Sequence, residues 1–232
     1  MSPRVHLVTG AGSGIGAAVA RALHERGDEL WLLARSAGRA AELSTAFPGA
    51  HLVVADLADP ESMLGIETLP ERLDSLHHIA GVVELEPVAE LDPASLRAQV
   101  DVNLVAPMLL TRACLPALRA ARGLVVVANS GAGLSASATW SAYAASKFGI
   151  RAFADALRAE EQDHGVRVTT VYPSRTATPM QEKVHEQEGK VYDERMWIQP
   201  ETVAATILHV LDLPPDATIP EVTIRPLVPR PT

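Results

Sequence analysis

Short runs of apolar and β-branched residues alternate with helical patterns along almost the whole chain. The runs end at glycine, proline or polar residues, and the connections between them are short. Such alternation predicts a doubly wound parallel sheet, because parallel strands are joined by long crossovers, which are usually helices. We therefore expect an α/β fold with about seven mainly parallel strands flanked by helices. The predicted strands are Arg4–Thr9, Glu29–Ala34, His51–Ala55, Leu76–Gly81, residues 124–128, Val166–Tyr172 and Glu221–Arg225.

The helical patterns between these strands differ in regularity. One follows the first strand and stops at Gly27, and another leads up to about His164. Pro107 lies inside a long helical region, where it cannot donate a backbone hydrogen bond. We expect a kink there, with carbonyl groups left unpaired just after Asn103. The other predicted helices are Gly38–Phe47, Pro60–Leu73 (interrupted by Pro70), Pro93–Ala121 and Pro200–Leu213.

The segment from Thr178 to Trp197 is more polar than its neighbours. Met180, Val184 and Val191 form a sparse helical stripe in it, among several glutamates. Since few apolar positions make few core contacts, we expect a mobile substrate lid over residues 178–197. No internal repeat, low-complexity segment or linker interrupts the sequence, so residues 1–232 are predicted to form a single domain.

Composition narrows the class of protein. Hydrophobic residues make up 47% of the chain and charged residues 21%, as in a globular protein with a sizeable core. The net charge of −8 argues against nucleic acid or an anionic membrane as a partner. The single cysteine, Cys114, excludes an intrachain disulfide, has no metal-ligand spacing around it, and is expected to be a buried inert thiol. No apolar run approaches membrane-spanning length and no signal peptide precedes the first strand, so we expect a cytoplasmic protein.

A glycine-rich loop, Thr9-Gly-Ala-Gly-Ser-Gly-Ile-Gly16, joins the first predicted strand to the first helix. Glycines let the backbone approach a pyrophosphate, and the N–H groups and dipole of a helix N-terminus favour its negative charge. A tight connection is the alternative, but the strand before and the helix after are the context that a dinucleotide site requires. We therefore predict a Rossmann-type fold. The candidate cofactor residues in the loop are Gly10, Gly12, Ser13, Gly14, Ile15 and Gly16.

The end of the second strand bears on the choice between NAD and NADP. In the NAD fingerprint an acidic residue about 20 positions after the glycines binds the ribose 2′-hydroxyl. This chain has Ala34 there, followed by Arg35, Ser36 and Arg39. A missing carboxylate and a nearby guanidinium suit a 2′-phosphate, so NADP(H) is favoured over NAD(H), with Arg35 and Ser36 as contacts. The alternative is that Arg35 simply opens the next helix in solvent.

The third predicted strand ends at Asp56-Leu57, a second candidate contact with the cofactor. The Asp56 carboxylate could accept a hydrogen bond from the adenine amino group. Its alternative role is to cap the turn that follows.

The run from Asn129 to Lys147 carries the candidate chemistry. Tyr143 and Lys147 are four residues apart, which places them on one face of a helix. Tyrosine ionises near pH ~10, and an adjacent ammonium should lower that pKa, so that Tyr143 becomes a usable acid or base. Ser130 follows a strand, where open α/β sheets place their ligands, and could donate a hydrogen bond to a substrate carbonyl. For the Tyr–Lys pair alone, the alternative is an ordinary pair on a helix surface.

Taken together, these residues resemble the short-chain dehydrogenase/reductase family, in its single-domain, tyrosine-dependent branch. The resemblance covers nearly the whole chain. The glycine loop is similar to the family's cofactor loop, and Val102-Asn103-Leu104 is similar to the helix that carries its catalytic asparagine. Ser130, Tyr143 and Lys147 have the spacing of the family's catalytic serine and Tyr-x-x-x-Lys.

Two further segments match the family only in part. Ala80-Gly81 corresponds to half of an Asn-Asn-Ala-Gly segment, with His78 and Ile79 in place of the asparagines. Pro173 with Thr178 is similar to a Pro-Gly…Thr segment beside the nicotinamide, with Ser174 in place of the glycine. The resemblance implies that Ala80, Gly81, Pro173 and Thr178 bind the cofactor.

The resemblance also implies a catalytic tetrad. Tyr143 would be the acid in ketone reduction and the base in alcohol oxidation. Lys147 would lower the pKa of Tyr143 and hold the nicotinamide ribose, so both residues would also bind the cofactor. Ser130 would polarise the substrate carbonyl, and Asn103 would hold a water in a proton relay.

The implied function is an NADPH-dependent carbonyl reductase or secondary alcohol dehydrogenase that acts on a small apolar ketone or alcohol. An NAD-dependent alcohol dehydrogenase working oxidatively is one alternative. The other is an NADP(H)-binding redox sensor or scaffold, against which the intact tetrad argues. We expect a homodimer or homotetramer, with Arg175 facing solvent and not an acidic substrate. Expected substrate contacts are Ser130, Leu134, Trp140, Tyr143 and Met180, with Trp197 as a further candidate.

Overall fold

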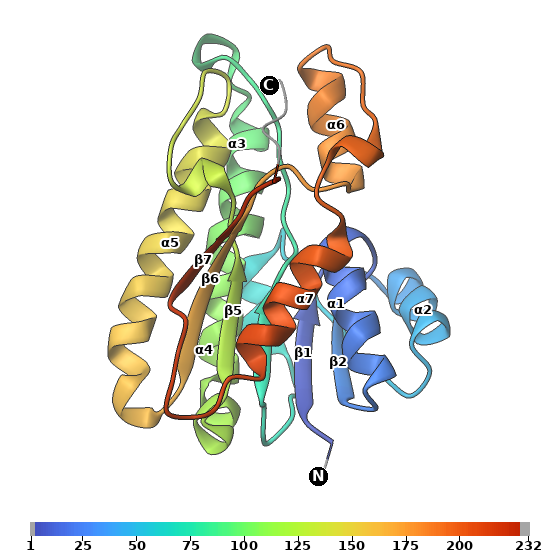
Figure 1. Cartoon of the computed structure of the whole chain (residues 1–232), viewed down its shortest axis with the longest axis vertical. Coiled ribbons are helices and arrows are strands. Elements are labelled where there is room, and N and C mark those ends of the chain that lie inside the picture. The colour runs from blue at the N-terminus through green and yellow to red at the C-terminus, as the bar shows by residue number, and fades with distance from the viewer. Residues whose placement is uncertain (1–2, 228–232) are drawn as a thin grey trace.

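Seven strands form one fully parallel sheet in the computed structural model, which describes residues 3–227 (Figure 1). The spatial order is β3-β2-β1-β4-β5-β6-β7. The predicted parallel α/β sheet is confirmed by this arrangement. The largest departure from the predicted strands is at β4, which ends at His78 and not at Gly81. The strands are β1 Val5–Thr9, β2 Glu29–Ala34, β3 His51–Val54, β4 Ser75–His78, β5 Leu124–Ala128, β6 Arg167–Pro173 and β7 Glu221–Ile224.

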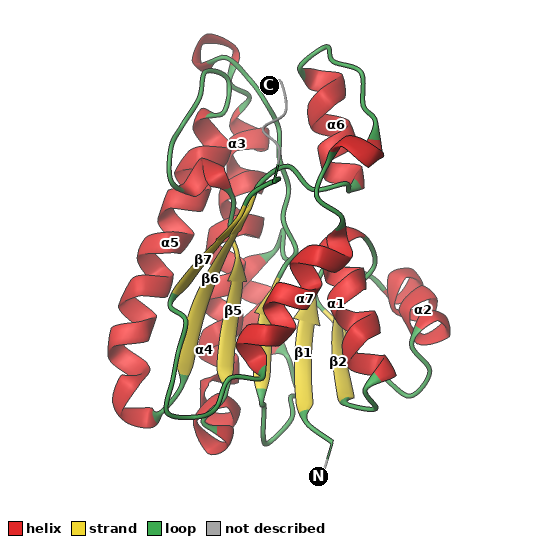
Figure 2. Cartoon of the chain, viewed as in Figure 1, coloured by secondary structure: helices red, strands yellow, loops and turns green. Residues whose placement is uncertain are grey.

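Helices cover both faces of the sheet (Figure 2). Helices α1, α2 and α7 pack on one face of the sheet, and helices α4 and α5 pack on the other face. A further helix, α6, lies beyond the carboxyl ends of the strands (Figure 1). The helices are α1 Gly14–Glu25, α2 Ala37–Ala46, α3 Pro93–Val100, α4 Ala106–Ala121, α5 Ser141–Glu161, α6 Pro179–Gln187 and α7 Pro200–Leu211.

The core is divided by the sheet into two clusters of buried side chains. On β5, Leu124 and Val126 belong to the cluster under α1 and α7, whereas Val125 and Val127 belong to the cluster under α4 and α5. Successive side chains of a strand point to opposite faces, and both faces are covered here. This is why the sequence shows continuous apolar runs instead of an alternation of apolar and polar residues.

The direction in which strands are added reverses between β1 and β4. The first three strands extend the sheet one way and the remaining four extend it the other way. In open α/β sheets this reversal leaves a crevice at the carboxyl ends of the two central strands, where ligands bind. The Thr9 hydroxyl closes the base of the crevice, because it accepts hydrogen bonds from the N–H groups of Ile79 (3.0 Å) and Ala80 (3.1 Å).

The long helical stretch predicted over residues 93–121 is present, and it is interrupted where expected. Between α3 and α4 the chain makes a π-helical turn over Asp101–Val105, which contains Asn103. Pro107 has no N–H to donate to the Asn103 carbonyl four residues earlier, which accounts for the wider turn. The proline thus places Asn103 at a break in the regular helix.

By length and composition this same stretch, Pro93–Ala121, is apolar enough to cross a membrane. The expectation that no apolar run approaches that length is therefore wrong. In the fold, Leu110, Cys114 and Leu118 of this stretch belong to the core that faces the sheet. A helix that packs against a sheet and a neighbouring helix needs an apolar surface of similar extent.

Two local predictions are also wrong. The helix expected over Pro60–Leu73 is only a 3-10 helix over Pro60–Gly65, because Gly65 and Pro70 both disfavour helical continuation. Val191 does not join the stripe on α6. That helix ends at Gln187 and is followed by Gly189 in the left-handed conformation, so Val191 lies in a loop and is 95% exposed.

Candidate active site

The four predicted catalytic side chains come from three elements that meet at the carboxyl end of the sheet. Ser130 follows β5, Asn103 lies in the π-helical turn, and Tyr143 and Lys147 lie near the start of α5. Asn103, Tyr143 and Lys147 are buried. The structure therefore brings together residues that are up to 44 positions apart in the sequence, from Asn103 to Lys147.

The Tyr143 hydroxyl is held in a buried site beside Ser130. A hydrogen bond between the two hydroxyls lowers the pKa of Tyr143, but burial outweighs it and raises that pKa to about 12. The Ser130 Oγ also accepts from the Ala132 N–H at 3.1 Å, which fixes its orientation. Tyr143 is therefore a neutral phenol with a proton to donate.

The expected lowering of the Tyr143 pKa by Lys147 is wrong for this structure. The Lys147 Nζ lies 5.6 Å from the centroid of the tyrosine ring and donates to the Ala128 carbonyl at 3.1 Å. Burial lowers the pKa of Lys147 to about 8. Because both side chains are removed from water, desolvation disfavours the charged form of each and is the largest cause of both pKa shifts.

Asn103 holds two parts of the site together. Its side-chain amide accepts from the Val82 N–H (2.9 Å) and donates to the Val82 carbonyl (2.9 Å). The same Nδ2 donates to Ser146 Oγ at 3.1 Å, and Ser146 donates to the Tyr143 carbonyl at 2.8 Å. The loop after β4, the π-helical turn and α5 are thereby fixed to one another.

Two supporting residues were missed in the sequence analysis. Ser146 stands between Tyr143 and Lys147 in the helix that carries them both. Asn129 is buried and donates to the Lys147 carbonyl at 3.0 Å, while its Oδ1 accepts from the Ser130 N–H at 2.8 Å. The signal was their position: each is a polar residue adjacent to a predicted catalytic residue within an apolar run.

The glycine loop forms a cradle at the switch point between β1 and β4. Gly10 has a φ of +75°, and a Cβ there would lie 2.9 Å from the Ala80 N–H nitrogen. A Cβ on Gly16 would lie 2.2 Å from the Gly10 carbonyl oxygen. The loop leads into α1, whose N-cap residue Ser13 makes no capping hydrogen bond through its side chain. The free N–H groups of the helix N-terminus thus fit the pyrophosphate of a dinucleotide.

The other predicted cofactor residues surround this cradle. Ile15, Pro173 and Thr178 line a cavity that Ser130 and Tyr143 also line. Thr178 caps the N-terminus of α6, where its Oγ1 accepts from the Gln181 N–H at 3.2 Å. Its methyl group lies so near the loop that a Cβ on Gly14 would be 2.8 Å from it.

A second depression follows β2. It is lined by Ser13, Arg35, Ser36, Gly38, Arg39 and Glu42. Arg39 donates to the Gly12 carbonyl at 2.8 Å and forms an ion pair with Glu42. The Ser36 hydroxyl caps α2 by accepting from the Arg39 N–H at 3.2 Å. Arg35 has no carboxylate within ion-pair distance among the described residues, so its guanidinium is available to a ligand.

The two roles considered for Asp56 are not equally supported. Its Oδ1 accepts from the Ala58 N–H at 3.0 Å, which is the capping role. Leu57 is buried in the core next to it. Neither side chain lines the cavity beside Tyr143.

The cavity beside Tyr143 has a volume of about 470 Å³. All five predicted substrate contacts line it, as does Trp197. The Trp140 ring meets the Tyr143 ring edge-on, with centroids 5.7 Å apart. Val184 and Met180 of α6 pack with Tyr143 in a small separate apolar cluster, so α6 lies against the candidate acid.

Arg175 does not face solvent as expected. Its guanidinium forms an ion pair with Glu188 at 2.6 Å and lies 5.7 Å from the centroid of the Trp197 ring. The two partners lie 13 and 22 residues further along the chain, on the α6 side of the cavity. Arg175 therefore joins the end of β6 to the segment that covers the site.

Comparison with known proteins agrees with this geometry. The family model described as short chain dehydrogenase matches residues 4–189. The chain belongs to the short-chain dehydrogenase family. It is 32% identical to an uncharacterized short-chain type dehydrogenase/reductase of Sinorhizobium fredii, over 96% of this chain and 91% of that protein.

Solved structures resemble this short-chain dehydrogenase over nearly its full length. An alcohol dehydrogenase from the archaeon Thermococcus sibiricus, complexed with 5-hydroxy-NADP, has a TM-score of 0.82 and 25% identity, with 100% of both chains covered. A short-chain dehydrogenase of Escherichia coli complexed with NADPH has a TM-score of 0.82 and 26% identity, with 95% of both chains covered. The protein is therefore an oxidoreductase that uses NAD(P) and acts on alcohol or carbonyl groups of small molecules.

Proposed function

We propose that this short-chain dehydrogenase is an NADPH-dependent carbonyl reductase, or secondary alcohol dehydrogenase, for small apolar ketones and alcohols. The observation that carries the proposal is the neutral, buried Tyr143 hydroxyl, hydrogen-bonded to Ser130 on the wall of a cavity that both apolar and polar side chains line. A protonated phenol beside a second hydroxyl is suited to protonate a carbonyl oxygen as negative charge develops on it.

Each member of the tetrad has a part in this proposal. The nicotinamide, when bound, supplies or accepts the hydride. Ser130 donates a hydrogen bond to the substrate carbonyl oxygen, and Tyr143 transfers its proton to that oxygen to give the alcohol. Lys147, whose Nζ lies 5.6 Å from the centroid of the Tyr143 ring, would bind the ribose hydroxyls. The Asn103 carbonyl, which Pro107 deprives of its regular helix partner, would hold a water that restores the proton.

The proposal includes a preference for NADP(H). It is supported by the absence of a carboxylate at Ala34 and by the guanidinium of Arg35 in the depression after β2. Two of the solved structures that resemble this chain are described as complexes with NADPH or 5-hydroxy-NADP. The roles assigned to Ala80, Gly81, Pro173 and Thr178 belong to the same proposal, and are supported by their positions at the carboxyl ends of β4 and β6 and at the start of α6.

Tyr143→Phe tests the chemistry. It removes the transferable proton and keeps the ring that packs against Trp140, so ketone reduction should fall by at least about a hundredfold. Affinity for NADPH, followed by its fluorescence, should stay within about threefold. Tyr172→Phe serves as the control, because Tyr172 is buried on β6 and bonds Glu221 away from the site. Near-normal turnover in Tyr143→Phe would exclude Tyr143 as the acid.

A further inference from the structure

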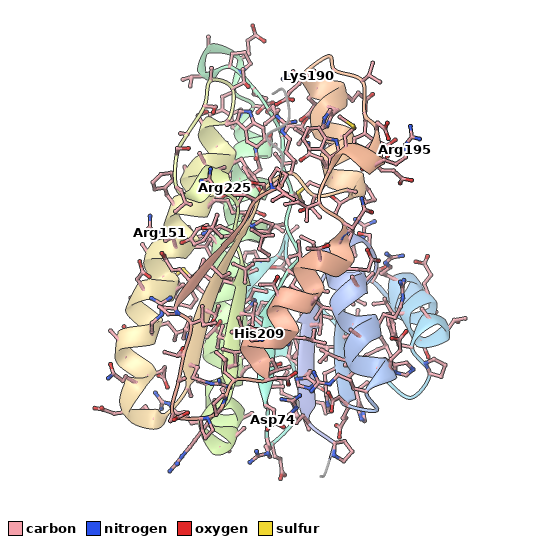
Figure 3. All side chains as sticks on the ribbon, viewed as in Figure 1. Asp74, Arg151, Lys190, Arg195, His209 and Arg225 are labelled. Atoms are coloured by element: carbon pink, nitrogen blue, oxygen red, sulfur yellow. The ribbon has the colours of Figure 1, made fainter. Side chains whose placement is uncertain are left out.

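Arg225 lies at the same edge of the sheet as the candidate active site. β7 pairs in parallel with β6, with Ile224 opposite Pro173, and the Ser174 N–H donates to the Ile224 carbonyl at 2.9 Å. Arg225 is the next residue, at the carboxyl end of β7 (Figure 3). Its side chain lines the same cavity as Ser130 and Tyr143.

The charge of this cavity is not balanced. Two arginines line it, and no aspartate or glutamate does so among residues 3–227. The charge of Arg175 is matched by Glu188 at 2.6 Å. For Arg225, by contrast, the described part of the chain offers no carboxylate within 4.0 Å. The cavity of a protein with a net charge of −8 therefore holds one exposed, uncompensated cation.

The position of Arg225 sets how far a bound anion would be from the reacting carbonyl. Ser130 follows β5 and Arg225 follows β7, with β6 between them. Neighbouring strands lie about 4.8 Å apart, so the two backbones are separated by roughly 10 Å. The side chains of Trp197 and Pro226, which line the same cavity as Arg225, are apolar. A ligand that reaches from Ser130 to Arg225 would pack an apolar body against them and place an anion at its far end.

We propose that Arg225 binds a carboxylate at the end of the substrate remote from its ketone, so that the preferred substrates are keto acids with an apolar spacer. The inference replaces the wholly apolar ketone of the proposed function by a ketone that also carries an anion, and depends on the proposed function for the identity of the reacting group. A guanidinium presents paired N–H donors that match the two oxygens of a carboxylate. Arg225 takes no part in the hydride or proton transfer, and therefore acts on binding and not on the chemical step.

The test compares two probes of the same shape, 4-acetylbenzoate and the neutral 4-acetylbenzamide. The unmodified enzyme should reduce the benzoate with a kcat/KM about tenfold higher, as expected for one charge-assisted contact. Arg225→Gln should remove this preference through KM, with kcat for both probes and the value for the benzamide unchanged. The preference should also shrink in 0.5 M salt, because the arginine is exposed and salt screens such contacts.

The control is Arg112→Gln, which removes the same charge from an exposed position on α4 outside the cavity. It should leave the preference intact. A binding titration that needs no turnover accompanies the kinetics: Trp140 and Trp197 line the cavity, so ligand binding should alter tryptophan fluorescence. The benzoate should bind about tenfold more weakly to Arg225→Gln than to the unmodified protein.

A preference for the benzoate that survives in Arg225→Gln, or is lost in Arg112→Gln, overturns the assignment. So does equal binding of the two probes to the unmodified protein. If neither probe is reduced, the proposed function fails, and the titration alone then decides the binding site. Loss of benzoate binding in Arg225→Gln supports the site in that case, and unchanged binding overturns it.

Discussion

At the scale of single residues, burial sets the pKa values of Tyr143 and Lys147 and therefore their protonation states. Burial raises the pKa of the phenol to about 12 and lowers that of the ammonium to about 8. At neutral pH the phenol therefore keeps its proton, which suits reduction, where the acid donates. Oxidation needs the phenolate and should be favoured only at higher pH.

The preference for NADPH over NADH is also predicted to depend on single residues. Arg35→Ala should weaken NADPH binding by about ten- to a hundredfold, or ~1.5–3 kcal/mol, and leave NADH nearly unchanged, because only NADPH carries the 2′-phosphate. Ala34→Asp should reverse the preference, since a carboxylate accepts from the ribose hydroxyl and repels the phosphate. Equilibrium titrations with both cofactors measure these effects.

Arg39→Ala is the matched control for the cofactor prediction. Arg39 is engaged by Glu42 and by the Gly12 carbonyl, so its removal should affect NADPH less than the removal of Arg35. An unmodified protein that binds NADH more tightly than NADPH would contradict the assignment and favour the NAD-dependent alternative.

At the scale of the secondary-structure element, the π-helical turn between α3 and α4 is the feature that leaves the Asn103 carbonyl without its regular helix partner. Pro107→Ala restores an N–H that can bond the Asn103 carbonyl, so the π-helical turn should relax toward a regular helix. We expect kcat to fall roughly tenfold, because the proposed water loses its acceptor, with stability unchanged or raised. Pro116→Ala is the control, since Pro116 lies inside α4 away from the site. Equal effects of the two substitutions on kcat would exclude the proposed relay.

The segment over residues 178–197 is the second element whose role we test, because we predict that it moves. α6 packs Val184 against Tyr143, and two of its side chains, Lys183 and Gln187, bond Glu84 in the loop after β4. We expect this lid to open for substrate entry, and its amide hydrogen exchange to slow when cofactor and ketone bind.

Glu84→Ala removes the bonds from Lys183 and Gln187 to the Glu84 carboxylate, and leaves the bond from the Leu85 N–H to Gln187 Oε1. It should speed exchange in α6 before ligand binds, whereas Glu182→Ala, on the same helix, should not. Exchange in α6 of the unmodified protein that is already as slow as in β5 would show that the segment is not a lid.

At the scale of the whole molecule, a sheet covered on both faces buries polar groups that cannot become charged. His6, His77 and His78 are buried on β1 and β4, and burial lowers the pKa of each. For His78 the pKa falls to about 3, while Nε2 bonds the Thr111 hydroxyl at 2.8 Å. Because the unfolded chain binds the proton more readily, these residues reduce stability as pH falls below about 6.5.

His78→Asn tests this pH dependence. Between pH 7 and pH 5 the unmodified protein should lose about 2 kcal/mol more of its unfolding free energy than the variant, since a histidine with a folded pKa near 3 adds ~1.4 kcal/mol per pH unit. Urea unfolding at both pH values measures the difference. His209→Asn, at an exposed position on α7 (Figure 3), is the control and should behave like the unmodified protein. Identical pH slopes for His78→Asn and the unmodified protein would show that His78 does not ionise on unfolding in this range.

Local sequence determined the strands, the glycine cradle and the chemistry of the tetrad. Strands buried on both faces must be continuously apolar, and the loop needs a residue that accepts a φ of +75° at Gly10, which glycine does without strain. The four-residue spacing of Tyr143 and Lys147 fixes their common face on a helix. These features depend only on neighbours in the chain, so they could be predicted without the fold.

The tertiary structure decided what depends on distant neighbours. The pKa of Tyr143 moved opposite to expectation because desolvation, which the sequence does not record, is its largest cause and outweighs the hydrogen bond with Ser130. Arg175 met Glu188 instead of solvent, and Arg225 entered the cavity, because chain segments far apart in sequence converge at one edge of the sheet. Burial and long-range pairing arise only when the strands assemble, and they set the charge of each group.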